Sequence, residues 1–317
     1  MADPSGKPTA LINRVAIIGL GLIGGSIGKA IRLHGLAGQV VGFAGEDHGQ
    51  QALALGLIDE VAPSLADAVS SADLVIVATP VTVVPSVFEH IARHLGEQAI
   101  ITDCASTKAS VVLAARQYLG AAFDRYVPGH PIAGSEFSGP TAAREGLFEG
   151  KRWLFSPVNR AQERHVDGLM DLVRGFGARP AILDAAEHDA LFAEYSHAPH
   201  ALVYALCLAV ADGPHADRLA DLAGAGFRDT TRIGASSPSL WADILFDNAE
   251  PTLASLGRVR QALDEVAAVL ASGDKTALQA VVARASDWRA KLESSSQERV
   301  KERKSQERKN LSDSQRD

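Results

Sequence analysis

Residues 14–26, RVAIIGLGLIGGS, decide the fold. The apolar run at 14–19 predicts a buried β-strand, and the apolar spacing of 23–33 predicts a helix. Three glycines with the spacing GxGxxG lie between the two elements. This spacing is a weak signal alone, but between a strand and a helix it indicates a dinucleotide-binding turn.

Each glycine of the turn has a predicted role. We expect Gly19 to allow the tight turn, Gly21 to let the backbone approach a pyrophosphate, and Gly24 to let the helix pack closely on the strand. The free N–H groups of the first helical turn, at Leu22 and Ile23, would face the phosphates. The alternative interpretation is a glycine-rich turn that binds no ligand.

Short apolar segments and amphipathic helical stretches alternate after this turn. Strands are expected at 39–43, 73–78 and 99–103, each followed by a helical stretch. Strands separated in this way predict βαβ units and a parallel, doubly wound sheet of the Rossmann type. We expect two further short segments, 126–127 and 153–155, to extend that sheet.

The sequence changes character after about residue 159. A short strand is expected at 181–183, and from residue 187 the pattern is almost entirely helical and rich in Ala and Leu. Long apolar helices favour a homodimer through the helical domain over a self-contained bundle. The polar tail from residue 294 predicts disorder, or else a solvated helical extension. The predicted division is a leader (1–13), a Rossmann domain (14–158), a helical substrate and dimerisation domain (159–293) and a tail (294–317).

Composition excludes several classes of function. The 317-residue chain is 46% hydrophobic and 22% charged, as expected for a globular protein. A net charge of −7 disfavours a nucleic-acid partner. No segment has the apolar length of a membrane helix, and we expect neither a signal peptide nor a membrane partner. Two distant cysteines, Cys104 and Cys207, favour a reducing, cytoplasmic location.

The choice between NAD and NADP depends on the end of the second strand. An acidic residue there would bind the ribose 2′-hydroxyl of NAD, but Ala44 occupies the position. Glu46 and Asp47 follow closely and would repel a 2′-phosphate. The sequence therefore favours NAD, and leaves NADP open.

Three later segments are expected at the carboxyl edge of the sheet, where ligands of such folds bind. Thr79-Pro80 closes the third strand and is predicted to contact the cofactor, with a simple turn as the alternative. Ser106 lies in DCASTK after the next strand, where an N-cap is the alternative role. His130 lies in GHPIAGSE, and histidine is the natural proton acceptor near neutral pH.

Together these segments resemble the prephenate dehydrogenase family, including its arogenate and cyclohexadienyl members. The resemblance rests on GLGLIGGS, TP, DCASTK and GHPIAGSEFSG, followed by SHAPH at 196–200 and GFRDTTRI at 226–233. It covers residues 14–288 in order. It implies oxidative decarboxylation of prephenate or arogenate with hydride transfer to NAD(P), giving 4-hydroxyphenylpyruvate or tyrosine.

The resemblance also implies roles for individual residues. His130 would accept the proton of the substrate hydroxyl, and Ser106 would hold that hydroxyl or the histidine. Arg232 would bind a substrate carboxylate, and His197 and His200 would face the substrate. No carboxylate pattern completes a metal site with these histidines, so we expect no metal.

Two alternatives stay open. A β-hydroxyacid dehydrogenase has a similar architecture but uses a catalytic Lys in its helical domain, and residues 188–208 contain none. A nucleotide-binding sensor would bind the cofactor without turnover. His188-Asp189 is expected to lie on the surface or to cap a helix rather than to form part of the cleft.

Overall fold

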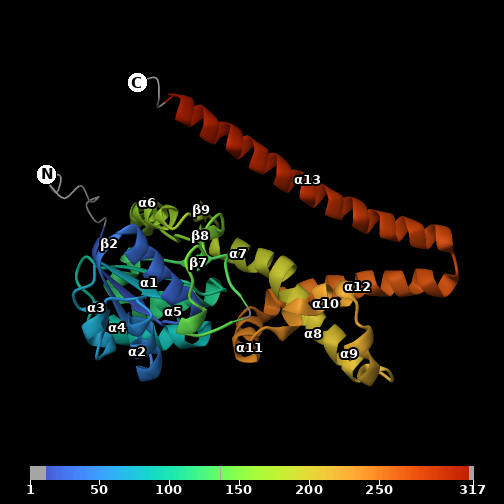
Figure 1. Cartoon of the computed structure of the whole chain (residues 1–317), viewed down its shortest axis with the longest axis horizontal. Helices are drawn as coiled ribbons and strands as arrows, with labels where there is room; N and C mark the ends of the chain where they lie inside the picture. The colour runs from blue at the N-terminus through green and yellow to red at the C-terminus, as the bar shows by residue number, and fades with distance from the viewer. Residues whose placement is uncertain (1–11, 136, 314–317) are drawn as a thin grey trace. The chain divides into compact units, whose positions relative to one another are not determined.

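The computed structural model describes residues 12–135 and 137–313 (Figure 1). The chain divides into two compact units between Ser255 and Leu256. The predicted leader lies outside the described residues except for residues 12 and 13. The first unit contains the sheet and every predicted site residue.

The main sheet has six parallel strands in the order β3-β2-β1-β4-β5-β6. Val15 of the central strand faces Val40 on one side and Leu74 on the other. This strand order is that of a Rossmann fold and confirms the predicted class. The strands are β1 (Ile12–Ile18), β2 (Ala37–Phe43), β3 (Glu60–Val61), β4 (Leu74–Val77), β5 (Ile100–Asp103) and β6 (Tyr126–Val127).

Alternating side chains of the strands pack into two cores. Val15 and Ile17 point to the face that α1 and α6 cover, while Ala16 and Ile18 point to the face that α3, α4 and α5 cover. Both faces of the sheet are therefore buried, which explains the continuous apolar strands. The helices are α1 (Leu22–His34), α2 (Glu46–Ala54), α3 (Leu65–Val69), α4 (Val84–Ile91), α5 (Ala109–Tyr118) and α6 (Arg160–Gly175).

A second, three-stranded sheet corrects one expectation. The segment around Trp153 forms β8 (Arg152–Phe155), but β8 does not extend the main sheet. It pairs antiparallel with β7 (Gly129–Pro131) and parallel with β9 (Arg179–Ile182), the strand expected at 181–183. Residues 126–127 do join the main sheet as β6.

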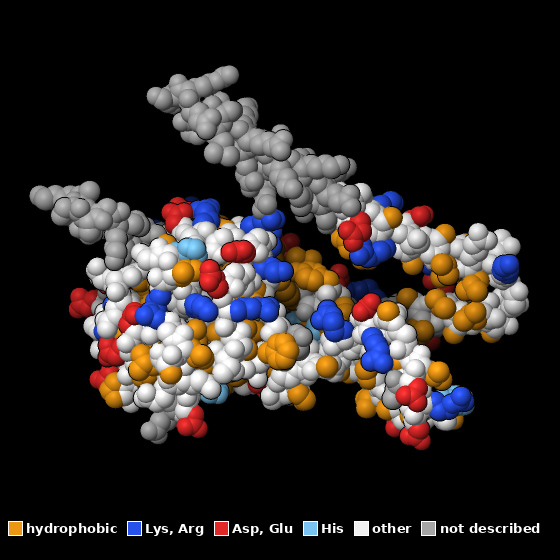
Figure 2. All heavy atoms as spheres, viewed as in Figure 1, with side chains coloured by type: hydrophobic (Ala, Val, Ile, Leu, Met, Phe, Trp, Pro, Cys, Tyr) orange, Lys and Arg blue, Asp and Glu red, His pale blue; other side chains and the backbone are white. Residues whose placement is uncertain are grey.

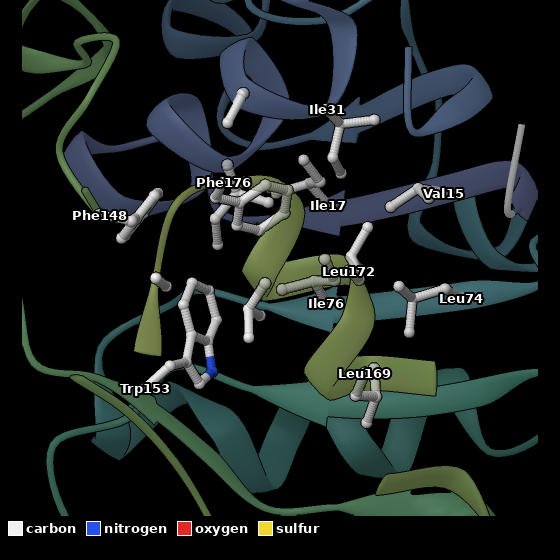
Figure 3. Packing of buried hydrophobic residues seen from close by; sticks show 14 of the residues in the cluster. Val15, Ile17, Ile31, Leu74, Ile76, Phe148, Trp153, Leu169, Leu172 and Phe176 are labelled. Atoms are coloured by element: carbon white, nitrogen blue, oxygen red, sulfur yellow. The ribbon is translucent and has the colours of Figure 1, made fainter. Parts of the chain in front are cut away.

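The second sheet shares the core of the first. Trp153 of β8 and Leu169 of α6 belong to the same buried cluster as Ile17 and Leu74 (Figure 3). The core therefore continues past residue 158, after which the sequence pattern becomes mainly helical. The predicted division into domains at that residue stays a prediction.

The rest of the first unit is helical. Asp184 begins it by accepting hydrogen bonds from the N–H groups of Ala186 and Glu187. Within the described part of the chain, no helix is both long enough and apolar enough to cross a membrane. The elements are α7 (Ala185–Phe192), a π-helical turn η4 (Ala193–His197), α8 (Ala198–Ala211), α9 (Leu219–Leu222), α10 (Ala225–Thr231), the 3₁₀ turn η6 (Arg232–Ala235) and α11 (Pro238–Asp247).

The second unit is a helical hairpin. It contains most of α12 (Ala249–Ser272) and all of α13 (Lys275–Asp313), which are joined through Gly273 at φ 70°. Arg284 of α13 binds Glu265 of α12 at 2.8 Å. Helix α13 continues into the polar tail as far as Asp313. The predicted disorder of the tail and its alternative, a solvated helical extension, both stay predictions.

Candidate active site

The glycine turn between β1 and α1 leaves free space at one position only. A Cβ at Gly24 would lie 1.9 Å from the carbonyl oxygen of Gly19, and Gly19 itself has φ 95°. Both positions therefore require glycine for the fold. A Cβ at Gly21 would meet nothing within 4 Å. Space for a ligand is thus next to Gly21, where the sequence predicts the pyrophosphate.

Two other features fit a dinucleotide at this turn. Helix α1 begins at Leu22 and Ile23 without a side-chain cap, so its first N–H groups are available to phosphate oxygens. The Thr79 hydroxyl, after β4, is buried and has no hydrogen-bond partner among the described residues. Pro80 follows it as the N-cap of a 3₁₀ turn. These residues could hold the dinucleotide.

The end of β2 gives less information. Ala44 follows the last residue of β2 and is half-buried against the core, and Asp47 is exposed on α2. The side chain of Glu46 lies outside the described residues. Of the described side chains at these positions, only that of Asp47 is charged, and its carboxylate would repel a 2′-phosphate.

Asp103, at the carboxyl end of β5, is the centre of a fully buried polar network. One carboxylate oxygen accepts hydrogen bonds from Tyr126 Oη at 2.7 Å and from the N–H of Gly129 at 3.0 Å. The other accepts from the N–H of Ala105 and from Lys108 Nζ, and Lys108 also donates to the carbonyl of Gly129 at 2.6 Å. The network therefore ties the loop after β5 to β7.

This network positions two predicted site residues. Ser106 lies in the loop between Asp103 and Lys108, half-buried, and its hydroxyl has no partner within the described chain. It is not the N-cap of α5, since Lys108 occupies that position. His130 follows Gly129 on β7 and is 7% exposed. Both residues thus depend on Asp103 for their placement.

His130 is the first member of a buried relay. Its Nδ1 lies 2.8 Å from Nε2 of His188, and Nδ1 of His188 lies 2.8 Å from a carboxylate oxygen of Asp189. Asp189 also accepts hydrogen bonds from the N–H groups of Lys108 and Ala109, so it caps α5 from the helical segment. The expectation that His188-Asp189 serves on the surface is wrong for His188, which is fully buried against His130 and Phe192.

The relay fixes which nitrogen of each imidazole carries a proton. A carboxylate only accepts hydrogen bonds, so Nδ1 of His188 must donate to Asp189. Neutral His188 then accepts at Nε2, and Nδ1 of His130 must be the donor in that contact. Neutral His130 is left with an unprotonated Nε2, which can accept a proton.

Burial and charge keep both imidazoles neutral. Burial lowers the pKa of His130 well below its ordinary value, and His188, Lys108 and His197 lower it further. Burial also lowers the pKa of His188, although its hydrogen bond to Asp189 opposes the shift. Burial alone would raise the pKa of Asp189, but hydrogen bonds from His188, Ala109 and Lys108 outweigh it and lower that pKa.

His197, His200 and Arg232 come from three helical segments. His197 is buried at the end of η4 and accepts a hydrogen bond from Asn248. His200, on α8, stacks on Trp241 of α11 with ring centroids 3.4 Å apart. Burial lowers the pKa of His200 and the charge of Arg232 lowers it further, while a hydrogen bond to the backbone of Ser196 opposes the shift. Arg232 is exposed and has no acidic partner among the described residues.

Sequence reasoning missed Asp103, Lys108 and Asn248 as site residues. Asp103 and Lys108 were visible in DCASTK, where two opposite charges five residues apart follow a buried strand. Asn248 lies outside every predicted motif. Glu136, in the motif around His130, lies outside the described residues, and within the described ones no group of three or more His, Cys, Asp or Glu could hold a metal.

A Rossmann sheet with a glycine turn and a buried histidine at its carboxyl edge defines a dinucleotide-dependent dehydrogenase. Family models described as the nucleotide-binding domain and the dimerization domain of prephenate dehydrogenase match residues 27–182 and 184–284. The chain therefore belongs to the prephenate dehydrogenase family.

Individual relatives agree with this membership. Prephenate dehydrogenase of Bacillus subtilis is 35% identical over 87% of this chain and 75% of its own. Cyclohexadienyl dehydrogenase of Zymomonas mobilis is 33% identical over 83% of this chain and 90% of its own. A crystal structure of prephenate dehydrogenase from A. aeolicus, in complex with hydroxyphenyl propionate and NAD+, superposes with a TM-score of 0.82. The match covers 89% of this chain and 98% of that chain at 28% sequence identity.

Gly21→Val tests the dinucleotide site. A Cβ at this position would meet no other heavy atom within 4 Å, so the fold should survive while the pyrophosphate is obstructed. We expect cofactor affinity, measured by calorimetry, to fall at least tenfold, equivalent to about 1.4 kcal/mol. Gly168→Val, also in open space but on α6, is the matched control and should bind normally. Unchanged affinity in folded Gly21→Val would place the cofactor elsewhere.

Proposed function

We propose that this protein catalyses the oxidative decarboxylation of prephenate, arogenate or both with NAD(P)+, giving 4-hydroxyphenylpyruvate or tyrosine. The observation that carries the proposal is the relay of His130, His188 and Asp189, which leaves Nε2 of His130 free to accept a proton. Membership of the prephenate dehydrogenase family supplies the substrate class.

The reaction needs a base beside the ring hydroxyl. Hydride leaves the carbinol carbon, the hydroxyl proton passes to the base, and the ring carboxylate departs as CO2, which leaves an aromatic ring. Bound NAD(P)+ accepts the hydride. The protein must therefore hold the hydroxyl, take its proton and bind the substrate's negative charges.

His130 is the proposed base. As Nε2 takes the proton, positive charge develops on the imidazole of His130. Nδ1–H of His130 donates to His188, and His188 in turn donates to the negatively charged Asp189. The ionised carboxylate of Asp189 thus stabilises the transient imidazolium, in a site where burial and Lys108 oppose it. The low pKa that results keeps His130 ready to accept a proton across the neutral range.

Four other residues would bind the substrate. Ser106 has an unpartnered hydroxyl at the same sheet edge and would hold the ring hydroxyl. Arg232 is free of acidic partners within the described chain, and its planar guanidinium suits a carboxylate. His197 and His200 would line the helical side of the substrate, as the family resemblance implies.

The cofactor preference and the assembly are part of the proposal. Asp47 near the end of β2 supports NAD over NADP, because a carboxylate repels a 2′-phosphate. A homodimer is supported by the dimerization-domain match. Hydrophobic side chains are also exposed on the α12–α13 hairpin (Figure 2). Leu263, Leu270 and Trp288 are among the exposed apolar residues of the hairpin. The free thiols of Cys104 and Cys207 fit a cytoplasmic protein.

Initial rates test the function directly. Each of prephenate and arogenate is supplied with NAD+ and with NADP+, and reduced nicotinamide is followed by absorbance. We expect turnover with at least one substrate and higher kcat/KM with NAD+. Cofactor binding without turnover of either substrate would contradict the proposal and favour a nucleotide sensor.

His130→Asn tests the base. Asparagine keeps a hydrogen-bonding side chain but cannot accept the proton, so kcat should fall by about 10²–10⁴-fold with cofactor affinity unchanged. Because the pKa of His130 is lowered, wild-type kcat/KM should stay level as pH falls through the usual histidine value of about 6.5 and decline only below it. The variant should lose that acidic limb.

The control for this substitution is His165→Asn, on α6 and away from the relay, which should leave rate and pH profile unchanged. Near-normal kcat in His130→Asn with the same acidic limb would assign the base to another group.

Arg232→Ala tests the carboxylate contact. Loss of a charged hydrogen bond costs about 1.5–3 kcal/mol, so KM should rise by about 10- to 150-fold with a smaller change in kcat. Arg228→Ala is the matched control, because Arg228 Nε donates to the carbonyl of Ala223. If KM rises in Arg228→Ala and not in Arg232→Ala, Arg228 is the clamp.

A further inference from the structure

Asn248 connects two parts of the site that no sequence motif joins. It lies between α11 and α12 and is 3% exposed. Its Nδ2 lies 2.8 Å from the backbone carbonyl oxygen of Asp189 and 2.9 Å from Nδ1 of His197. One amide group therefore contacts the residue that ends the His130 relay and a second buried histidine.

The chemistry of these contacts fixes their direction. A backbone carbonyl only accepts hydrogen bonds, so the amide must turn its NH2 group toward Asp189. The second hydrogen of that group then points at Nδ1 of His197, which must accept it. Neutral His197 consequently carries its proton on Nε2.

We propose that Asn248 is a positioning residue that holds His197 in the Nε2–H tautomer, so that His197 meets the substrate as a neutral hydrogen-bond donor. Within the described residues Nε2 has no protein partner, which leaves it available to an acceptor oxygen of the substrate. The role at the substrate rests on the proposed function, whereas the tautomer itself does not.

The charge state of His197 agrees with this geometry. Burial lowers the pKa of His197 to about 4; His188 and His200 also lower it, while Asp189 and Asp247 oppose the shift. His197 is therefore neutral near pH 7. Without the proton fixed on Nε2, a neutral imidazole could equally present a lone pair to the substrate and repel its oxygen.

The same amide aligns the two histidine systems. Asp189 uses its carboxylate for His188 and its carbonyl for Asn248, so a shift of Asn248 would reach both His130 and His197. The structure thus assigns opposite functions to the two histidines. His130 presents an acceptor nitrogen and His197 a donor nitrogen, and each tautomer is set by a side chain behind it.

Imidazole ¹⁵N NMR of the full-length protein without ligand tests the tautomer. In the wild type, the His197 signals should show a protonated Nε2 and an unprotonated Nδ1. Asn248→Asp replaces the donor with an acceptor of equal size, and Nδ1 should then carry a proton. Asn248→Leu should give a mixture of both tautomers.

Thr252→Val is the matched control. Thr252 is buried one turn further along α12, and its hydroxyl has no partner among the described residues, so its removal should leave the His197 signals unchanged. An Nδ1–H signal for His197 in the wild type, or an unchanged Nε2–H signal in Asn248→Asp, would overturn the proposal.

Kinetics separate this role from general structural support. Loss of one neutral hydrogen bond predicts a rise in KM of about 2- to 10-fold in Asn248→Leu, with kcat less affected. In a His197→Ala background, Asn248→Leu should raise KM by a smaller factor, because the part of its effect that passes through His197 is already lost. Equal effects in both backgrounds would reject a role through His197, while the NMR result would stand even if neither proposed substrate reacts.

Discussion

The buried carboxylate of Asp103 is the interaction on which the site depends. It ends the strand β5 and accepts four hydrogen bonds, from Tyr126, Gly129, Ala105 and Lys108. Such a charge is tolerable in a dry core only because every lone pair has a donor and a cation lies beside it. Removing one member of a buried ion pair destabilises the folded protein by about 3–5 kcal/mol, so few substitutions of Asp103 or Lys108 should be tolerated. These contacts link the Rossmann sheet rigidly to β7, the strand that carries the proposed base.

Asp189 makes the corresponding link from the helical side. Its carboxylate caps α5 of the Rossmann fold and orients His188, while its carbonyl receives Asn248. A helix N-terminus stabilises negative charge, which helps to keep this carboxylate ionised in a buried place. The two aspartates therefore hold the site from opposite sides, and neither is required to touch the substrate.

Local pattern was enough to predict the Rossmann sheet and the glycine turn, and it singled out His130, whose role stays a prediction. Gly21 and His130 are marked by neighbours in the sequence, and the family resemblance joined the remaining motifs. Local pattern assigned the strand around Trp153 to the wrong sheet, because the residues of a short apolar strand do not determine which sheet it joins. It also failed to place His188 in the site and missed Asn248. His188 contacts His130, which is 58 residues away in the chain, and Asn248 contacts His197, which is 51 residues away. Contacts of that kind are set by how helices pack, and one sequence does not record them.

The π-helical turn at Ala193–His197 has an evolutionary consequence. Such turns contain one residue more than the α-helix would need, and they occur often at functional sites. Because successive residues of an α-helix are rotated by about 100°, deleting one residue upstream of Ser196 would restore regular winding and turn His197 away from Asn248. A change in the length of this segment should therefore disturb the site more than a substitution at one of its exposed positions. Ala193 is fully buried, but we expect substitutions of the exposed Glu194 and Tyr195 to be tolerated better than the loss of either residue.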